Sequence, residues 1–169
     1  MEAKIKNIRS LIKKLENAGK EIEKARYKYR PIQNELLKKY DLRTEDDDQI
    51  TNIEDLYMVD EQYDEKMYEY YGEMFVVLNK MGANLKEEGD CPVCIAEWKR
   101  EKVKKEFALT VLDLYKSIGL KGYENVTPNM LMCKLSTYEK FVSHSLQLFN
   151  CVDIKSEEQL KRMVKSVSF

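Results

Sequence analysis

The chain has 169 residues, 43% hydrophobic and 35% charged, so its length suits one domain and its charge exceeds the usual quarter. Six glycines and three prolines leave little turn material, which argues against a sandwich or barrel and favours helices. A single histidine and the lack of a glycine-rich phosphate loop exclude most catalytic templates that a sequence reveals. We expect a non-catalytic, all-α protein: a four- to five-helix antiparallel bundle forming one domain over residues 1–169.

The first predicted helix covers residues 2–30, where apolar residues from Ile5 to Tyr29 recur at three- and four-residue steps. Its spacing also suits a coiled-coil seam, so the basic segment 1–40 either packs in the bundle or projects as an arm.

Pro31 is expected to kink or end this helix, after which residues 32–40 resume as a short helix. An acidic connector, residues 41–59, follows and is predicted to be a loop. The remainder, residues 60–169, is predicted to form the helical core.

Four helices are predicted in this core, over residues 60–88, 95–118 and 127–150 and from residue 157 onward. The first two should form an antiparallel hairpin. Thr127 and Pro128 are typical of a helix start, and Ser156 with Gln159 forms a capping box.

The Cys-Pro-Val-Cys segment at residues 91–94 joins the two helices of that hairpin and is the most specific chemical signal. Two thiolates at this spacing can bind one tetrahedral Zn²⁺ ion, but they supply only half of its ligands. Helix lengths place the end of helix 127–150 level with this segment and Cys133 at the far end. The sequence therefore predicts a zinc site, which needs the chain to fold back near Asn150. Its ligands are Cys91, Cys94, His144 and Cys151.

Three other interpretations of these residues stay open. One zinc ion could be shared between two molecules. The two cysteines could instead form a redox pair, because Lys99, Arg100, Lys102 and the helix start would all depress a thiol pKa. The strands of a thioredoxin-like fold are lacking, however. In the third, the cysteines are plain core or turn residues and His144 is a satisfied polar group.

The helix, Cys-Pro-Val-Cys, helix order resembles the apex of zinc-hook ATPases, where two hairpins meet and share one zinc ion. The resemblance covers at most residues 60–118, and Ile95 stands where such hooks often carry glycine. It implies a homodimer through Cys91 and Cys94. The ATPase activity does not carry over, because the chain has no nucleotide-binding head.

Charge is unevenly distributed although the net charge is only −1. Lys and Arg against Asp and Glu number 12 against 5 in residues 1–40, 4 against 16 in residues 41–90, and 13 against 9 in residues 91–169. In one interpretation, oppositely charged helices lie beside each other and their charges solvate the surface. In the other, a charged face recognises a partner.

A cluster of basic residues around the start of helix 95–118 could contact phosphates together with residues 1–40, which predicts a nucleic-acid-binding factor as the alternative function. In the other interpretation it is a solvated face with Trp98 in the core. The cluster consists of Lys99, Arg100, Lys102, Lys104 and Lys105.

Tyrosines among acidic residues, including Tyr57, Tyr68 and Tyr71, suit a protein interface or a helix packed on both sides. We expect an intracellular interaction or regulatory protein, a zinc-stabilised helical scaffold that binds a macromolecular partner, with a protein favoured over nucleic acid. A zinc-bridged homodimer is the further alternative. No apolar run approaches the roughly 20 residues of a membrane span and no signal peptide is evident, so a cytoplasmic or other intracellular location without membrane association is expected.

Overall fold

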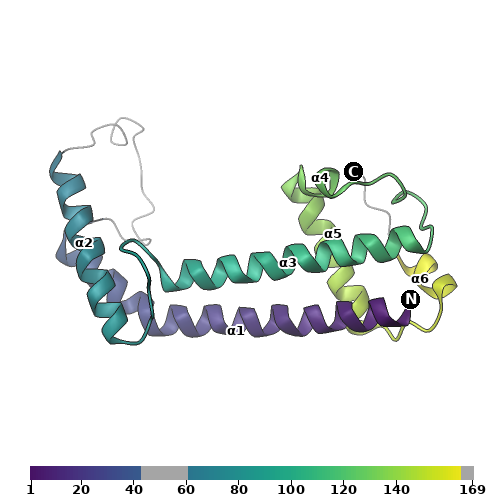
Figure 1. Cartoon of the computed structure of the whole chain (residues 1–169), viewed down its shortest axis with the longest axis horizontal. Coiled ribbons are helices and arrows are strands. Elements are labelled where there is room, and N and C mark those ends of the chain that lie inside the picture. Colours follow the sequence, from purple (N-terminus) through teal and green to yellow (C-terminus); the bar gives the residue numbers. More distant parts are fainter. Residues whose placement is uncertain (43–60, 165–169) are drawn as a thin grey trace. The chain divides into compact units, whose positions relative to one another are not determined.

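The computed structural model describes residues 1–42 and 61–164, and within these ranges all regular structure is helical and no strand occurs (Figure 1). The all-α prediction is confirmed. None of the helices within these ranges is both long and apolar enough to cross a bilayer. The described helices are α1 (Glu2–Lys39), α2 (Glu61–Lys80), α3 (Pro92–Ser117), α4 (Pro128–Met132), α5 (Leu135–Cys151) and α6 (Glu157–Met163).

The chain divides into two compact units, to each of which α1 and α3 contribute. One unit comprises Met1–Gly19 and Lys99–Phe169 and has 18 Lys and Arg against 10 Asp and Glu; we call it the basic unit. The other comprises Lys20–Trp98 and has 11 against 20; we call it the acidic unit. The segregation of charge along the sequence is therefore also a segregation between units.

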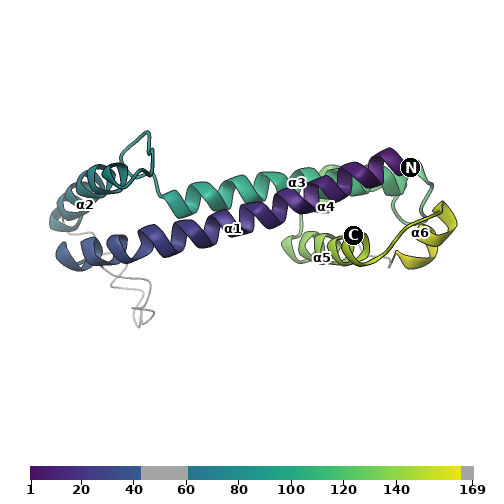
Figure 2. The same cartoon turned by 90° about the horizontal axis from the view of Figure 1, so that it is seen from below.

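The core of the basic unit is built where α5 runs crosswise to the parts of α1 and α3 that belong to this unit (Figures 1 and 2). Apolar side chains of α1 such as Ile8 and Leu11 are buried there. Tyr115 of α3 lies at its centre, with its ring centroid 5.1 Å from that of Tyr123 and 5.9 Å from that of Phe141. This aromatic cluster includes several of the largest fully buried side chains of the unit.

Two helices of the basic unit begin where the sequence predicts. The Thr127 hydroxyl accepts a hydrogen bond from the Met130 amide at 3.2 Å, with Pro128 at the first helical position. The Ser156 hydroxyl accepts one from the Gln159 amide at 3.1 Å. Both caps are confirmed, because each satisfies an amide that the first helical turn leaves without a backbone partner.

The core of the acidic unit joins α1 and α2 with the segments that follow each helix. At its edge the Tyr40 hydroxyl donates to Glu73 Oε2 at 2.5 Å, and Lys39 pairs with the same carboxylate. Within this unit α3 runs antiparallel to α1, since Arg26 pairs with Glu97 and Gln33 contacts Cys91. The buried core residues are Tyr29, Leu36, Leu42, Tyr70, Met74, Leu78 and Leu85.

The prediction that Pro31 could end the first helix is wrong. In the structure α1 continues without interruption to Lys39. The proline removes one amide donor, but it lies on the exposed face of the helix. Tyr29 and Leu36, on either side, are buried in the same core and hold the helix in register.

The predicted helix 127–150 is two helices, separated at Cys133 and Lys134. Lys134 is extended, with φ −120° and ψ 112°, and its carbonyl accepts from the amides of Thr137 and Tyr138 to begin α5. The predicted helix 60–88 ends at Lys80, and α3 begins at Pro92, inside the Cys-Pro-Val-Cys segment.

Candidate functional site

The four predicted zinc ligands fall into two pairs in different units. Cys91 directly precedes α3 and Cys94 lies in its first turn, in the acidic unit, whereas His144 and Cys151 lie on α5 in the basic unit. The fold-back near Asn150 that the zinc prediction needs does not occur, because α5 stays helical through Cys151 and the chain leaves the helix only at Val152, which is extended. Among the residues that the structure describes, no group of three or more His, Cys, Asp or Glu could hold a metal ion. The zinc site and its intrachain or shared character stay predictions.

The two thiols of the acidic unit contact each other and α1. Cys91 Sγ accepts the Cys94 amide at 3.3 Å and faces the Gln33 side-chain amide nitrogen at 3.7 Å. A pocket of about 170 Å³ lies beside both sulfurs and is lined by Arg30 and Asn34 among others. Burial, followed by a hydrogen bond to Cys91, raises the pKa of Cys94 to about 11. This shift is opposite to the depressed thiol pKa that the redox interpretation assumed.

His144 and Cys151 share a pocket of about 260 Å³ in the basic unit. Aromatic and aliphatic side chains form most of its wall, and burial raises the pKa of Tyr115, whose hydroxyl contacts Ser145. Seven positions separate His144 from Cys151 on α5, a rise of about 10 Å, so these two groups cannot exchange a proton directly. What the structure brings together is therefore a pocket with a largely apolar wall that also carries His144, Ser145, Gln147 and Cys151.

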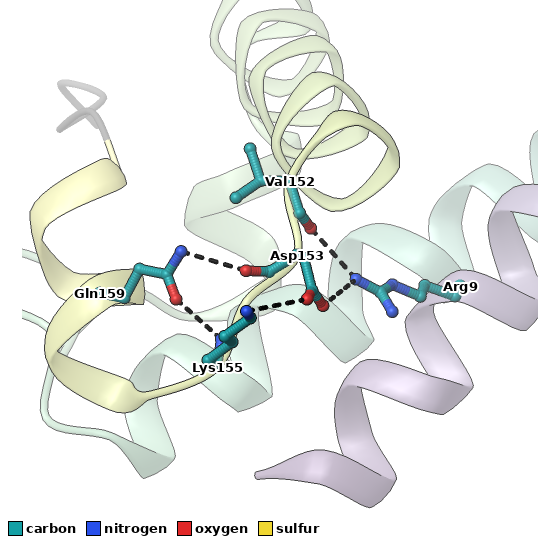
Figure 3. A network of polar contacts seen from close by, with 5 residues as sticks. All are labelled: Arg9, Val152, Asp153, Lys155 and Gln159. Atoms are coloured by element: carbon teal, nitrogen blue, oxygen red, sulfur yellow. Dashed lines mark hydrogen bonds and ion pairs between the residues drawn. The ribbon is translucent and has the colours of Figure 1, made fainter.

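A basic groove runs along the first turns of α1 in the same unit. It has a volume of about 980 Å³ and is lined by Lys6, Arg9, Lys13 and Lys155, together with Glu2 and Asp153. Figure 3 shows how Arg9 crosses to the loop after α5: its guanidinium donates to the Val152 carbonyl at 3.1 Å and lies 3.8 Å from the Asp153 carboxylate.

The loop wall of this groove is held by α6. Gln159 Oε1 accepts the Lys155 amide at 2.8 Å, and its side-chain nitrogen donates to the Asp153 carbonyl at 3.1 Å (Figure 3). Asp153 lies between Arg9 and Lys155, 3.8 Å from each. Neither the Lys6 nor the Lys13 side chain has a hydrogen bond or ion pair with another described residue, so the two ammonium groups are available to an anion.

The five residues of the predicted basic cluster differ in how exposed their side chains are. Lys104 lies largely buried, with 13% of its side chain exposed, and contacts Glu139 at 2.5 Å and Glu101 at 3.5 Å. It therefore has a structural role in the basic unit. The other members, Lys99, Arg100, Lys102 and Lys105, are exposed.

The three predicted partner-binding tyrosines also differ in exposure or in whether the structure describes them. Tyr68 is 77% exposed on α2, whereas Tyr71 is half-buried against the acidic unit's core, its ring centroid 5.3 Å from that of Tyr70. Tyr57 lies outside the described residues.

Two aromatic residues that the sequence analysis did not expect to be exposed lie at the surface. Tyr27 is 89% exposed and Trp98 is 60% exposed, so Trp98 is not the core residue of the solvated-face interpretation. Each directly follows a member of the Arg26–Glu97 ion pair, which joins α1 to α3 at 2.7 Å. The exposure of Tyr27 could have been predicted, because Tyr27 lies off the apolar stripe of its helix. The exposure of Trp98 could not, because Trp98 lies on the expected apolar stripe of its helix.

Comparison of the chain with protein-family models, curated proteins and solved structures found no match. The function is therefore proposed from the geometry and chemistry of this chain.

Proposed function

We propose that the chain is a non-catalytic interaction protein whose acidic unit binds a basic protein partner through exposed aromatic side chains. The observation that carries the proposal is the exposure of Tyr27, Tyr68 and Trp98, one on each helix of the acidic unit. Tyrosine and tryptophan are enriched at binding hot spots, because a rigid ring with a polar tip buries a large area at a small entropy cost.

The charge of the acidic unit supports a basic partner. Its 11 Lys and Arg against 20 Asp and Glu create a negative field, which speeds association with a positive surface. In this account the carboxylates raise the association rate, and the aromatic rings, once desolvated, determine how long the complex lasts.

Site-specific photocrosslinking tests the proposal. A photoreactive phenylalanine derivative would replace Tyr27, Tyr68 or Trp98 in the full chain, with Leu135 as the matched control because it is 72% exposed in the basic unit. We expect one basic protein to be crosslinked from the positions in the acidic unit and not from position 135. The proposal fails if no protein is crosslinked from these positions, or if the same proteins are crosslinked from all four.

A second candidate function, nucleic-acid binding, is favoured by the groove that contains Lys6 and Lys13. These side chains line the same groove as Arg9 and Lys155, and the unit that holds them has 18 Lys and Arg against 10 Asp and Glu. Phosphate contacts of this kind supply affinity without reading the base sequence.

Fluorescence anisotropy with single- and double-stranded oligonucleotides tests this candidate. The Lys6→Gln/Lys13→Gln double variant should bind more weakly than the native chain. It should also reduce the slope of log affinity against log salt by about 1 for each phosphate that no longer pairs with a lysine. Lys20→Gln/Lys80→Gln, with the same charge change on exposed residues of the acidic unit, is the control. Equal binding by both variants would rule out this groove.

A further inference from the structure

The pocket of the basic unit that His144 and Cys151 share is built on the aromatic cluster of that unit. Its volume is about 260 Å³, and Tyr115, Tyr123 and Phe141 line it. The ring centroids of these three residues are separated by 5.1, 5.9 and 6.1 Å. None of the three is more than 2% exposed, so their rings form the floor of the pocket.

Polar side chains surround the opening of this pocket. His144, Gln147 and Cys151 line it at intervals of three and four residues, which places them on one face of α5, and all three are exposed. Met163, at the end of α6, also lines it and is 39% exposed. A mostly apolar wall with a few polar groups is the usual composition of a small-molecule site.

We propose that this pocket binds a small planar aromatic molecule that carries one N–H or O–H donor, such as an indole. The proposal goes beyond partner binding and does not depend on it, because the pocket shares no residue with the exposed aromatic residues of the acidic unit or with the basic groove.

The wall of the pocket favours an aromatic ligand over an aliphatic one. Aromatic rings attract one another edge to face at centroid distances of about 4.5–7 Å, so a ligand ring would extend the existing cluster. The flexible thioether of Met163 can pack against the ligand from the rim. The volume fits two fused rings, because a cavity of about 150 Å³ accepts benzene and this pocket is larger.

Two hydroxyl groups determine which polar group the ligand should carry. Tyr115 and Ser145 both line the pocket, their side chains are hydrogen-bonded to each other, and Ser145 is only 2% exposed. Each hydroxyl has one donor and two acceptor sites. Because the bond between them uses one donor and one acceptor, the acceptor sites that remain outnumber the remaining donor. A ligand that donates a hydrogen bond is therefore favoured over one that only accepts.

Isothermal titration calorimetry of the full chain with indole and with N-methylindole tests the proposal. The two probes have similar shapes, but N-methylindole has no N–H donor. We expect indole to bind saturably at one site per chain and roughly fivefold more tightly than N-methylindole, because the methylated probe loses one hydrogen bond. In proton–nitrogen NMR spectra indole should shift the amide signals around Tyr123, Ser145 and Leu148 and leave those of the acidic unit unchanged.

Leu148→Phe and Leu146→Phe are a matched pair of variants. Both leucines are half-buried on α5, but Leu148 lines the pocket and Leu146 does not. Phenylalanine at position 148 should fill part of the pocket and weaken indole binding by about tenfold or more, whereas Leu146→Phe should bind within about twofold of the native chain. Circular dichroism verifies that each variant is folded.

Three results would overturn the proposal. The first is a lack of saturable indole binding, or amide shifts in the acidic unit as large as those around Ser145. The second is equal weakening of indole binding by the two leucine variants, because the ligand would then lie outside the pocket. The third is equal affinity for indole and N-methylindole, since the ligand class depends on the donor.

Discussion

At the scale of single residues, Glu73 links the end of α1 to α2. Hydrogen bonds from Lys39 and then from Tyr40 hold the pKa of its carboxyl below the ordinary value of 4.5. A carboxyl whose pKa is lowered by folding stabilises the folded state above its unfolded pKa, and this contribution is lost as pH falls through the folded pKa. Glu73→Gln should therefore be less stable than the native chain near neutral pH, and the difference should shrink in acid.

Urea unfolding at a series of pH values measures this difference, because other carboxyl groups titrate equally in both proteins. A gap that stays constant from neutral pH to below pH 4.5 would show that the Glu73 contacts do not form.

Lys104 gives a second prediction at this scale, with its neighbour in sequence as the control. Its ammonium contacts Glu139 and Glu101 and lies 5.4 Å from the Tyr138 ring centroid, and its stem is largely buried. Lys104→Ala should lower the free energy of unfolding by about 1 kcal/mol, because it removes both packing and ion pairing. Lys105→Ala, on an exposed residue, should change it by less than about 0.5 kcal/mol. Similar losses of stability in chemical denaturation would contradict this assignment.

At the scale of elements, two glycines in or after α2 should respond to alanine in opposite directions. Neither position has another atom within 4 Å of an added Cβ, so crowding plays no part. Gly72 lies inside the helix, where alanine is better by about 1 kcal/mol, whereas Gly82 follows it with φ +84°, where an L side chain costs about 1–2 kcal/mol. Thermal unfolding should show Gly72→Ala stabilised and Gly82→Ala destabilised, and a shared direction would exclude this backbone account.

The sequence predicted helices well where local chemistry determines them. Thr127 and Ser156 each cap a helix through their own side chains, so the residue types suffice. The break at Cys133 was not predicted, because Leu131 and Tyr138 are seven positions apart, in phase for one continuous helix, and both are buried. The continuation of α1 through Pro31 was not predicted, because it depends on the packing of Tyr29 and Leu36 in a core assembled from distant segments.

At the scale of the whole molecule, the candidate sites were less predictable than the helices. The zinc prediction rested on the length of a single helix over residues 127–150, and that length no longer applies because the segment forms α4 and α5. The division into a basic and an acidic unit was visible as charge order along the chain, but its boundaries within α1 and α3 follow from contacts between distant residues. Exposure of Tyr27 and Trp98 likewise depends on which helices pack beside them.

The central claim is that exposed aromatic residues of the acidic unit bind a basic protein. Its most direct measurement is the affinity of the crosslinked partner for Tyr68→Ala, with Leu135→Ala as the control on a residue of comparable exposure. Loss of a tyrosine hot spot costs about 2 kcal/mol, so Tyr68→Ala should bind roughly 30-fold more weakly, while Leu135→Ala should bind within about twofold of the native chain. Equal affinities for the two variants would contradict the account.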